Sequence, residues 1–295
     1  MFDKVLVGID GRQGGRDATA LAQRLAPAGG RITLAHVYGG PTAGGRAAAL
    51  ARPLALESAE RLLKRAAREC DLPVDTATVC ESSVGRGLHA LAERRRAELL
   101  VVGSCHRGML GRVLLGDDTA RSLNGAPCAV AVAPHGYAAS APQRLARIGV
   151  GWDGSPESAL AVHVARGLAA RHESTISALA VVSLRGVPIP GWWPKIASQL
   201  VDEEQNRLAE LEGVDGVVTY GDPGAELAAF SAELDLLIVG SRGYGPVGRL
   251  FHGSVSSYLV GHARCPLLVL PRGSLRESRP DANGHEVQAM FAGAA

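Results

Sequence analysis

Residues 5–11 read VLVGIDG, and residues 148–154 read IGVGWDG, so Asp10 of the first segment corresponds to Asp153 of the second at an offset of 143. A second pair of segments repeats further along the chain. Residues 97–104 (AELLVVGS) correspond to residues 234–241 (LDLLIVGS), where Gly103 matches Gly240 at an offset of 137. The two offsets differ only by a change in loop length. The chain is therefore predicted to contain one structural unit twice.

Within each copy, short apolar runs alternate with segments of helical periodicity. In the first copy we expect strands at residues 5–10, 31–38, 73–80, 98–103 and 129–133. The central runs, such as LLVVG and LLIVG, are apolar on both faces, as in parallel strands covered by helices on both sides. The predicted fold is α/β, with two tandem doubly wound, Rossmann-like, five-stranded parallel sheets.

The domain boundaries follow from the repeat. One domain is expected at residues 1–135 and the other at residues 144–271, joined by a linker rich in Gly, Ala, Ser and Pro. Residues 272–295 are polar and match neither copy, so they are predicted to form a disordered tail.

Composition excludes several classes of protein. The 295 residues are 46% hydrophobic and carry a net charge of +2, with the basic residues scattered along the chain. Neither nucleic acid nor a membrane is an expected partner. The five cysteines form no C-x-x-C pair, and the N-terminus enters a strand-like run with no signal sequence. We therefore expect a cytoplasmic protein.

The loop after the fourth predicted strand of the second copy carries a G-x-x-G-x9-G-S pattern, from Gly240 through Gly243 and Gly253 to Ser254. A glycine-rich loop that leads into a helix presents unpaired backbone N–H groups and the positive end of the helix dipole to an anion. Ser254 offers both a helix cap and a hydroxyl donor. The alternative is a turn that only connects a strand to a helix, and the loop alone does not decide between them.

The wider pattern resembles the universal stress protein family, whose ATP-binding members carry this loop at this place. VGWDGSP (150–156), ALAVV (178–182), LLIVGSRG (236–243) and RCPLLVLP (264–271) resemble its strands and turns. The resemblance covers both copies and implies a tandem member of the family that binds ATP together with Mg²⁺. It implies that Asp153 holds the adenosine moiety and that Val181 meets adenine through its backbone. Arg242 and Arg249 are candidate counter-charges for the phosphates, and the alternative is that each is a solvated loop arginine. The implied phosphate ligands are the backbone amides of Gly240, Gly243, Gly253, Ser254 and Val255.

The first copy keeps Asp10, Val37, Gly103 and Gly116 at the corresponding positions, as candidate ligands of a second nucleotide. However, His106 replaces the second glycine of the loop, and Asp117 replaces the serine. A carboxylate at a helix N-terminus repels phosphate and can itself cap the helix. We therefore expect the first copy to be a degenerate, structural half.

Motifs of several enzyme classes are missing from the sequence. There is no P-loop and no G-x-S-x-G elbow, and the G-x-G-x-x-G at residues 243–248 follows the fourth strand instead of the first. The expected function is that of an ATP-binding stress or dormancy regulator that acts through nucleotide occupancy and dimerisation, without fast catalysis. The alternatives are a slow ATP hydrolase and a nucleotide-free dimerisation scaffold. The resemblance also implies a pseudo-dimer within the chain, formed through the fifth strands, and a further homodimer.

Overall fold

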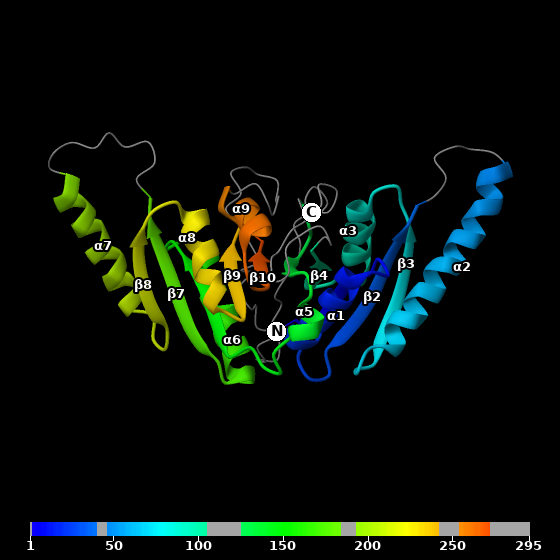
Figure 1. The fold of residues 1–295 in the computed structure, drawn as a ribbon, viewed down its shortest axis with the longest axis horizontal. Coiled ribbons are helices and arrows are strands. Elements are labelled where there is room, and N and C mark those ends of the chain that lie inside the picture. The colour runs from blue at the N-terminus through cyan, green and yellow to red at the C-terminus, as the bar shows by residue number, and fades with distance from the viewer. Residues whose placement is uncertain (1, 40–45, 105–124, 184–192, 242–253, 272–295) are drawn as a thin grey trace, which may run out of the picture.

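The computed structural model of the chain describes residues 2–39, 46–104, 125–183, 193–241 and 254–271. The predicted tail at 272–295 lies outside these residues. The described strands form one ten-stranded sheet in the order β3-β2-β1-β4-β5-β10-β9-β6-β7-β8 (Figure 1). None of the described helices is both long and apolar enough to cross a membrane.

Each half contributes five parallel strands to this sheet, in equivalent order. The elements of the first half are β1 (Lys4–Gly8), α1 (Gln13–Leu25), β2 (Arg31–Tyr38), α2 (Arg46–Arg68), β3 (Val74–Cys80), α3 (Val84–Arg95), β4 (Leu99–Gly103) and β5 (Ala129–Ala133). The linker forms α5 (Tyr137–Ser140). The second half consists of β6 (Arg147–Trp152), α6 (Pro156–His172), β7 (Thr175–Val182), α7 (Trp193–Ala209), β8 (Asp215–Tyr220), α8 (Pro223–Phe230), a 3₁₀ turn (Ser231–Glu233), β9 (Leu236–Gly240), α9 (Ser254–His262) and β10 (Leu267–Leu270). The α/β, doubly wound class predicted from the sequence is confirmed.

Two apolar cores lie on opposite faces of the sheet. Helices α1, α2, α6 and α7 cover one face, and α3, α8 and α9 cover the other. Successive residues of a strand point to opposite faces, so Val101 enters one core and Val102 enters the other. This arrangement explains why the inner strands are apolar at nearly every position.

The two halves meet at β5 and β10, which pair antiparallel with Val130 opposite Val269 and Val132 opposite Leu267. All the residues of both strands are buried. The pairing of fifth strands implied by the family resemblance is therefore present within the chain, as an internal pseudo-dimer. The two five-stranded sheets predicted from the sequence become a single continuous sheet.

A buried carboxylate fixes the linker against the first half. Asp17 on α1 is fully buried and accepts hydrogen bonds from the backbone N–H groups of Gly136 (2.9 Å) and Ala138 (2.8 Å) at the start of α5. The Gln13 side chain donates a third hydrogen bond to it at 2.9 Å. Arg24, two turns later on the same face of α1, donates to the carbonyl of Pro142 at 2.8 Å. The connection between the halves is consequently held along most of its length.

The C-terminus of α1 is capped from the second half. Arg171 at the end of α6 donates to the carbonyls of Leu25 (2.9 Å) and Ala26 (2.6 Å), and the His172 ring bonds the carbonyl of Arg24 at 2.9 Å. Carbonyl groups at the end of a helix lack partners within the helix and carry its negative dipole. A cation from one half therefore stabilises a helix of the other, in addition to the shared sheet.

Replacing Asp17 by alanine removes the acceptor of three hydrogen bonds and leaves two backbone donors beside α5 without their partner. We expect Asp17→Ala to lower the free energy of unfolding by about 2–3 kcal/mol, measured by urea denaturation. Asp71→Ala, which changes an exposed loop carboxylate, is the control and should have little effect. A loss from Asp17→Ala no larger than that of the control would contradict this role for the buried carboxylate.

Candidate functional site

A crevice opens at the C-terminal ends of the strands of the first half, where the strand order reverses between β1 and β4. This is the place at which open parallel sheets bind ligands. The cavity has a volume of about 260 Å³, and Asp10, Val37 and Gly103 all line it. The fold therefore brings together three of the four candidate residues of the first copy. The fourth, Gly116, lies outside the described residues.

The corresponding residues of the second half lie at the same end of the sheet. Trp152 pairs with Ala180, so Asp153 and Val181 follow on neighbouring strands, and Gly240 ends β9 on the other side of β6. Ser254 begins α9, and the half-buried Val255 packs against the core in the first turn of that helix. The remaining candidates, Arg242, Gly243, Arg249 and Gly253, lie outside the described residues.

Both candidate aspartates are fixed by the same local turn. An Asp10 carboxylate oxygen accepts a hydrogen bond from the backbone N–H of Arg12, and an Asp153 oxygen accepts one from the N–H of Ser155, each at 2.9 Å. The Ser155 hydroxyl also donates to Asp153. Such turns are typical of Asp directly after a strand. Each exposed carboxylate is thus oriented at the rim of the sheet before any ligand arrives.

The first glycine of each loop has a packing role. A Cβ atom added to Gly103 would lie 2.1 Å from the carbonyl oxygen of Gly14, and one added to Gly240 would lie 2.5 Å from the Cβ of Glu157. In both halves the helix that follows the first strand therefore starts directly against the end of the fourth strand. From the sequence, these glycines are expected to make room for a phosphate. The structure gives Gly103 and Gly240 a different role, because the close approach of the helix start requires glycine at both positions whether or not a ligand binds.

The helix N-termini beside the two sites differ. The N-cap of α1 is Arg12, which makes no side-chain capping bond, and the first turn contains no acidic residue. The N-cap of α6 is Ser155, whose hydroxyl accepts from the N–H of Ser158 at 3.2 Å, and Glu157 lies in its first turn. The N-terminus of α1 is therefore the more positive of the two. Its residues Gly14 and Gly15 line the first crevice and were not singled out from the sequence.

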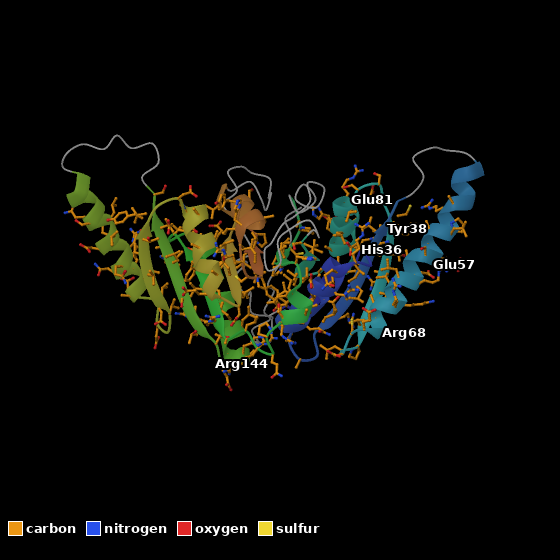
Figure 2. All side chains as sticks on the ribbon, viewed as in Figure 1. His36, Tyr38, Glu57, Arg68, Glu81 and Arg144 are labelled. Carbon is orange, nitrogen blue, oxygen red and sulfur yellow. The ribbon has the colours of Figure 1, made fainter. Side chains whose placement is uncertain are left out.

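His36 is a further lining residue that the sequence analysis did not connect to the site. It lies at the C-terminal end of β2, near Tyr38 and Glu81 (Figure 2). Its Nδ1 is 2.6 Å from the carbonyl oxygen of Ile9, which can only accept, so Nδ1 carries the proton of this bond. Val37 follows it in the strand, and this adjacency is the signal by which the sequence could have revealed it.

Among the described residues, no group of three or more His, Cys, Asp and Glu side chains is arranged to hold a metal ion.

Both halves of the chain match one known protein family. The model of the universal stress protein family matches residues 1–134 and residues 145–271. A universal stress protein of Mycobacterium bovis is 35% identical over 184 residues, which cover 59% of this chain and 61% of that protein. A second protein of this name from Mycobacterium tuberculosis is 29% identical over 204 residues, covering 64% of this chain and 69% of the relative. The match thus spans about three fifths of the length of the first of these relatives.

Solved structures share the fold across nearly the whole chain. A universal stress protein from Archaeoglobus fulgidus superimposes with a TM-score of 0.68 at 16% identity, covering 92% of this chain and all of that one. A putative universal stress protein from Pseudomonas aeruginosa gives a TM-score of 0.61, also at 16% identity, with 92% and 94% covered. At this level of identity the similarity concerns the fold.

The contact between Gly103 and Gly14 predicts that a single methyl group is costly at this position. Gly103→Ala should lower the free energy of unfolding by about 1–3 kcal/mol, because the backbone at the start of α1 must move to admit the Cβ atom. The control is Gly261→Ala in α9, where a Cβ would meet no atom within 4 Å. That change should leave stability unchanged or raise it by up to about 1 kcal/mol. Chemical denaturation of both variants tests this, and equal stabilities would contradict the packing role.

Proposed function

Because this chain belongs to the universal stress protein family, we propose that it is a cytosolic stress or dormancy regulator that binds ATP in its second half. Nucleotide occupancy and dimerisation carry its regulatory role, without fast catalysis. The bound nucleotide arrives with Mg²⁺, which screens and bridges phosphate oxygens. The first half contributes the fold and the internal pseudo-dimer.

One observation carries this proposal. The crevice of the first half gathers residues at the C-terminal ends of β1, β2 and β4, and the second half repeats this topology with Asp153, Val181 and Gly240 in the corresponding places. In the second half the loop sequence from Gly240 to Ser254 is the complete G-x-x-G-x9-G-S. The half with the complete loop is therefore the better candidate for a polyphosphate.

The roles of the second-half residues follow from their chemistry. Asp153 accepts a hydrogen bond from a ribose hydroxyl, and the backbone of Val181 meets the adenine edge. The amides of Gly240, Gly243, Gly253, Ser254 and Val255 surround the phosphates, because N–H groups at a helix N-terminus bind anions without added positive charge. Arg242 adds a counter-charge to the phosphates. The low lysine content of the chain, with only Lys4, Lys64 and Lys195, agrees with recognition through amides.

The first half has different residues at two of the corresponding positions. Asp117 stands where the second half has Ser254, and His36 faces the crevice where the second half has Ala180. A carboxylate at the helix N-terminus repels a phosphate chain. Asp10, Val37, Gly103 and Gly116 therefore serve the fold of the first half in this proposal, and the chain binds one ATP.

The proposal of no fast catalysis rests on the hydrogen bonds and the position of the Asp153 carboxylate. Its carboxylate accepts hydrogen bonds from Ser155 and is implied to lie at the ribose end of the nucleotide, away from the phosphate that would be attacked. A general base must reach the attacking water in order to act. A slow ATP hydrolase is the alternative, and a nucleotide-free scaffold is the third.

The nucleotide site makes opposite predictions for the two aspartates. Asp153→Ala should weaken ATP binding at least about tenfold, whereas Asp10→Ala should leave it within about twofold. Isothermal titration calorimetry measures both affinities and the stoichiometry, which should be one nucleotide per chain. Both aspartates are exposed and form the same turn, so each variant is a folding control for the other. Two equivalent sites per chain would contradict the asymmetry.

Binding should also stabilise the native chain. At a concentration of about 100 Kd, Mg²⁺-ATP should add roughly 2.7 kcal/mol to the free energy of unfolding, visible as a rise in Tm. No rise at millimolar ATP would support the scaffold instead.

Turnover separates the regulator from the hydrolase. With ATP in excess, phosphate release by the wild-type chain should not rise above that of Asp153→Ala, and should stay below the ~1 s⁻¹ at the lower end of typical enzyme turnover. A malachite green assay over many equivalents of ATP measures it, with Asp153→Ala as the background control. A faster rate that this variant abolishes would replace the regulator by an ATPase.

A further inference from the structure

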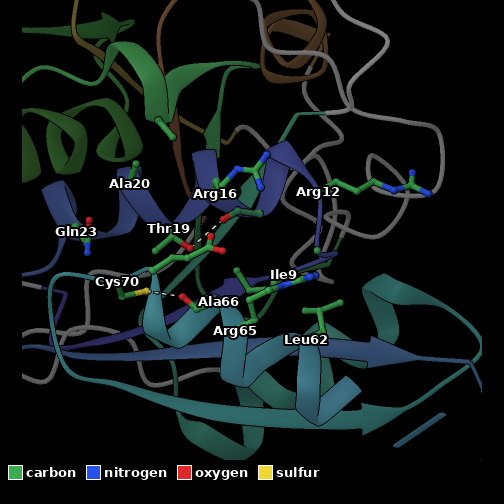
Figure 3. A pocket seen from close by; sticks show the side chains of 14 residues that line it. Ile9, Arg12, Arg16, Thr19, Ala20, Gln23, Leu62, Arg65, Ala66 and Cys70 are labelled. Carbon is green, nitrogen blue, oxygen red and sulfur yellow. Dashed lines mark hydrogen bonds between the residues drawn. The ribbon is translucent and has the colours of Figure 1, made fainter. Parts of the chain in front are cut away.

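A second and larger cavity lies between α1 and α2 of the first half, on the face of the sheet opposite α3. Its volume is about 440 Å³, which is in the range of small-molecule sites. The loop between β1 and α1 separates it from the crevice at the strand ends of the first half, since Ile9, Arg12 and Gly15 line both cavities. Figure 3 shows the two helices facing each other across this space.

Much of the wall is apolar. Ile9, Ala20, Leu62 and Ala66 line the cavity from the strand end and from both helices. The Thr19 hydroxyl donates to the carbonyl of Gly15 at 2.9 Å, and the Cys70 thiol donates to that of Ala66 at 3.3 Å (Figure 3). The Thr19 hydroxyl hydrogen is therefore used within α1, and the Cys70 thiol hydrogen is used at the C-terminal end of α2. The wall offers a ligand a mainly apolar contact surface.

An arginine from each of the two helices lines the cavity. Arg16 projects from α1 and Arg65 from α2, whereas Arg12 points away (Figure 3). The Arg16 guanidinium donates only to the neutral amide oxygen of Gln13, at 2.8 and 3.2 Å. Within the described residues, the Arg65 side chain forms no hydrogen bond or ion pair. Both cations are thus available to an anion from outside the chain.

The opposing charge lies at one end. Glu69 also lines the cavity and lies just past the C-terminal end of α2, four residues after Arg65. Burial, together with the charges of Asp71 and Glu69, raises the pKa of the Cys70 thiol, which keeps it neutral at pH 7. The positive N-terminus of α1 lies at the other end of the cavity. The cavity therefore has a cationic end and an apolar middle.

The second half differs at the corresponding positions. Trp152 takes the place of Ile9 and packs against the core on the same face of the sheet. Arg166 takes the place of Gln23 and donates to the carbonyl of Glu212 at 2.7 Å, linking α6 to the chain just after α7. The buried Val162 replaces Thr19. A larger side chain and a hydrogen-bonded bridge thus occupy the space between the helices that the first half leaves open.

We propose that the cavity between α1 and α2 is a second ligand site, which binds a small organic anion with an apolar body. The acid group pairs with Arg16 and Arg65, and the apolar body lies against Ile9, Ala20, Leu62 and Ala66. A carboxylate, sulfonate or phosphate fits the two guanidinium groups. The site is separate from the nucleotide crevice and does not depend on ATP binding.

The test uses two dyes on the full-length protein. Anilinonaphthalene sulfonate has an aromatic body and one acid group, and phenylnaphthylamine is the same body without the acid. Fluorescence titration of the wild-type chain should show one saturable sulfonate site that binds at least about tenfold more tightly than the neutral dye. Millimolar Mg²⁺-ATP should not displace the sulfonate. Full displacement by ATP would show that the dye occupies the ATP site proposed in the second half and would overturn the proposal, as would the absence of saturable binding.

Matched variants locate the site. Arg65→Gln should weaken sulfonate binding about tenfold and change neutral-dye binding less than about twofold. Arg61→Gln, the same charge change one turn earlier on α2 and outside the cavity, should alter neither. An equal loss from both arginine variants would indicate a general charge effect and overturn the proposal.

Filling the cavity gives a second readout. Ile9→Trp introduces the residue of the second half and should weaken both dyes at least about tenfold. Ala20→Leu fills the same space from α1 and serves if Ile9→Trp fails to fold, with His163→Leu at the corresponding position of α6 as its control. Undiminished dye binding in a folded filling variant would show that the dye binds elsewhere.

Discussion

The antiparallel pairing of β5 with β10 is the contact on which the molecule depends. Both strands are buried at every position, so neither half could leave its edge strand open to water without exposing an apolar surface. Pairing supplies each strand with hydrogen-bond partners and makes both cores continuous across the seam. It also sets the relation of the halves, which diverge from the seam with the C-terminal ends of β2 and β7 on the same side (Figure 1).

Within this shared frame the two halves differ at residues that line the cavities of the first half. The aspartate turn and the close contact of a helix start with the end of the fourth strand occur in both, because they are part of the fold. The lining residues differ: Ile9 corresponds to Trp152, and Gln23 to Arg166. A buried strand residue must fit its neighbours, whereas a residue facing a cavity can change size or charge at little cost to folding. A duplicated unit can therefore keep one architecture and offer two different sites.

The strands, the crossovers and the general position of the crevice were predictable from the sequence. Parallel strands buried on both faces must be apolar throughout, as in LLVVG and LLIVG, and ligand residues follow such strands in open sheets. Asp10, Val37 and Gly103 came from the repeat, as the first-half counterparts of residues named by the family resemblance, and all three line the crevice. The packing role of Gly103 was not predictable, because a glycine in a loop-like pattern gives no sign that another backbone lies against it. His36 was missed because a lone histidine in a strand has no pattern of its own.

The sequence by itself determined the duplicated unit, the parallel α/β class and the complete loop of the second half, since each is written in local order and spacing. Only the tertiary structure decided how Asp17 holds the linker, how Arg171 caps a helix of the other half, and where a cavity remains between two helices. These features depend on residues that are distant in sequence, such as Asp17 and Gly136 or Arg65 and Arg16, and on the separation of α1 from α2. That separation is set by packing on a common sheet, which no local pattern encodes.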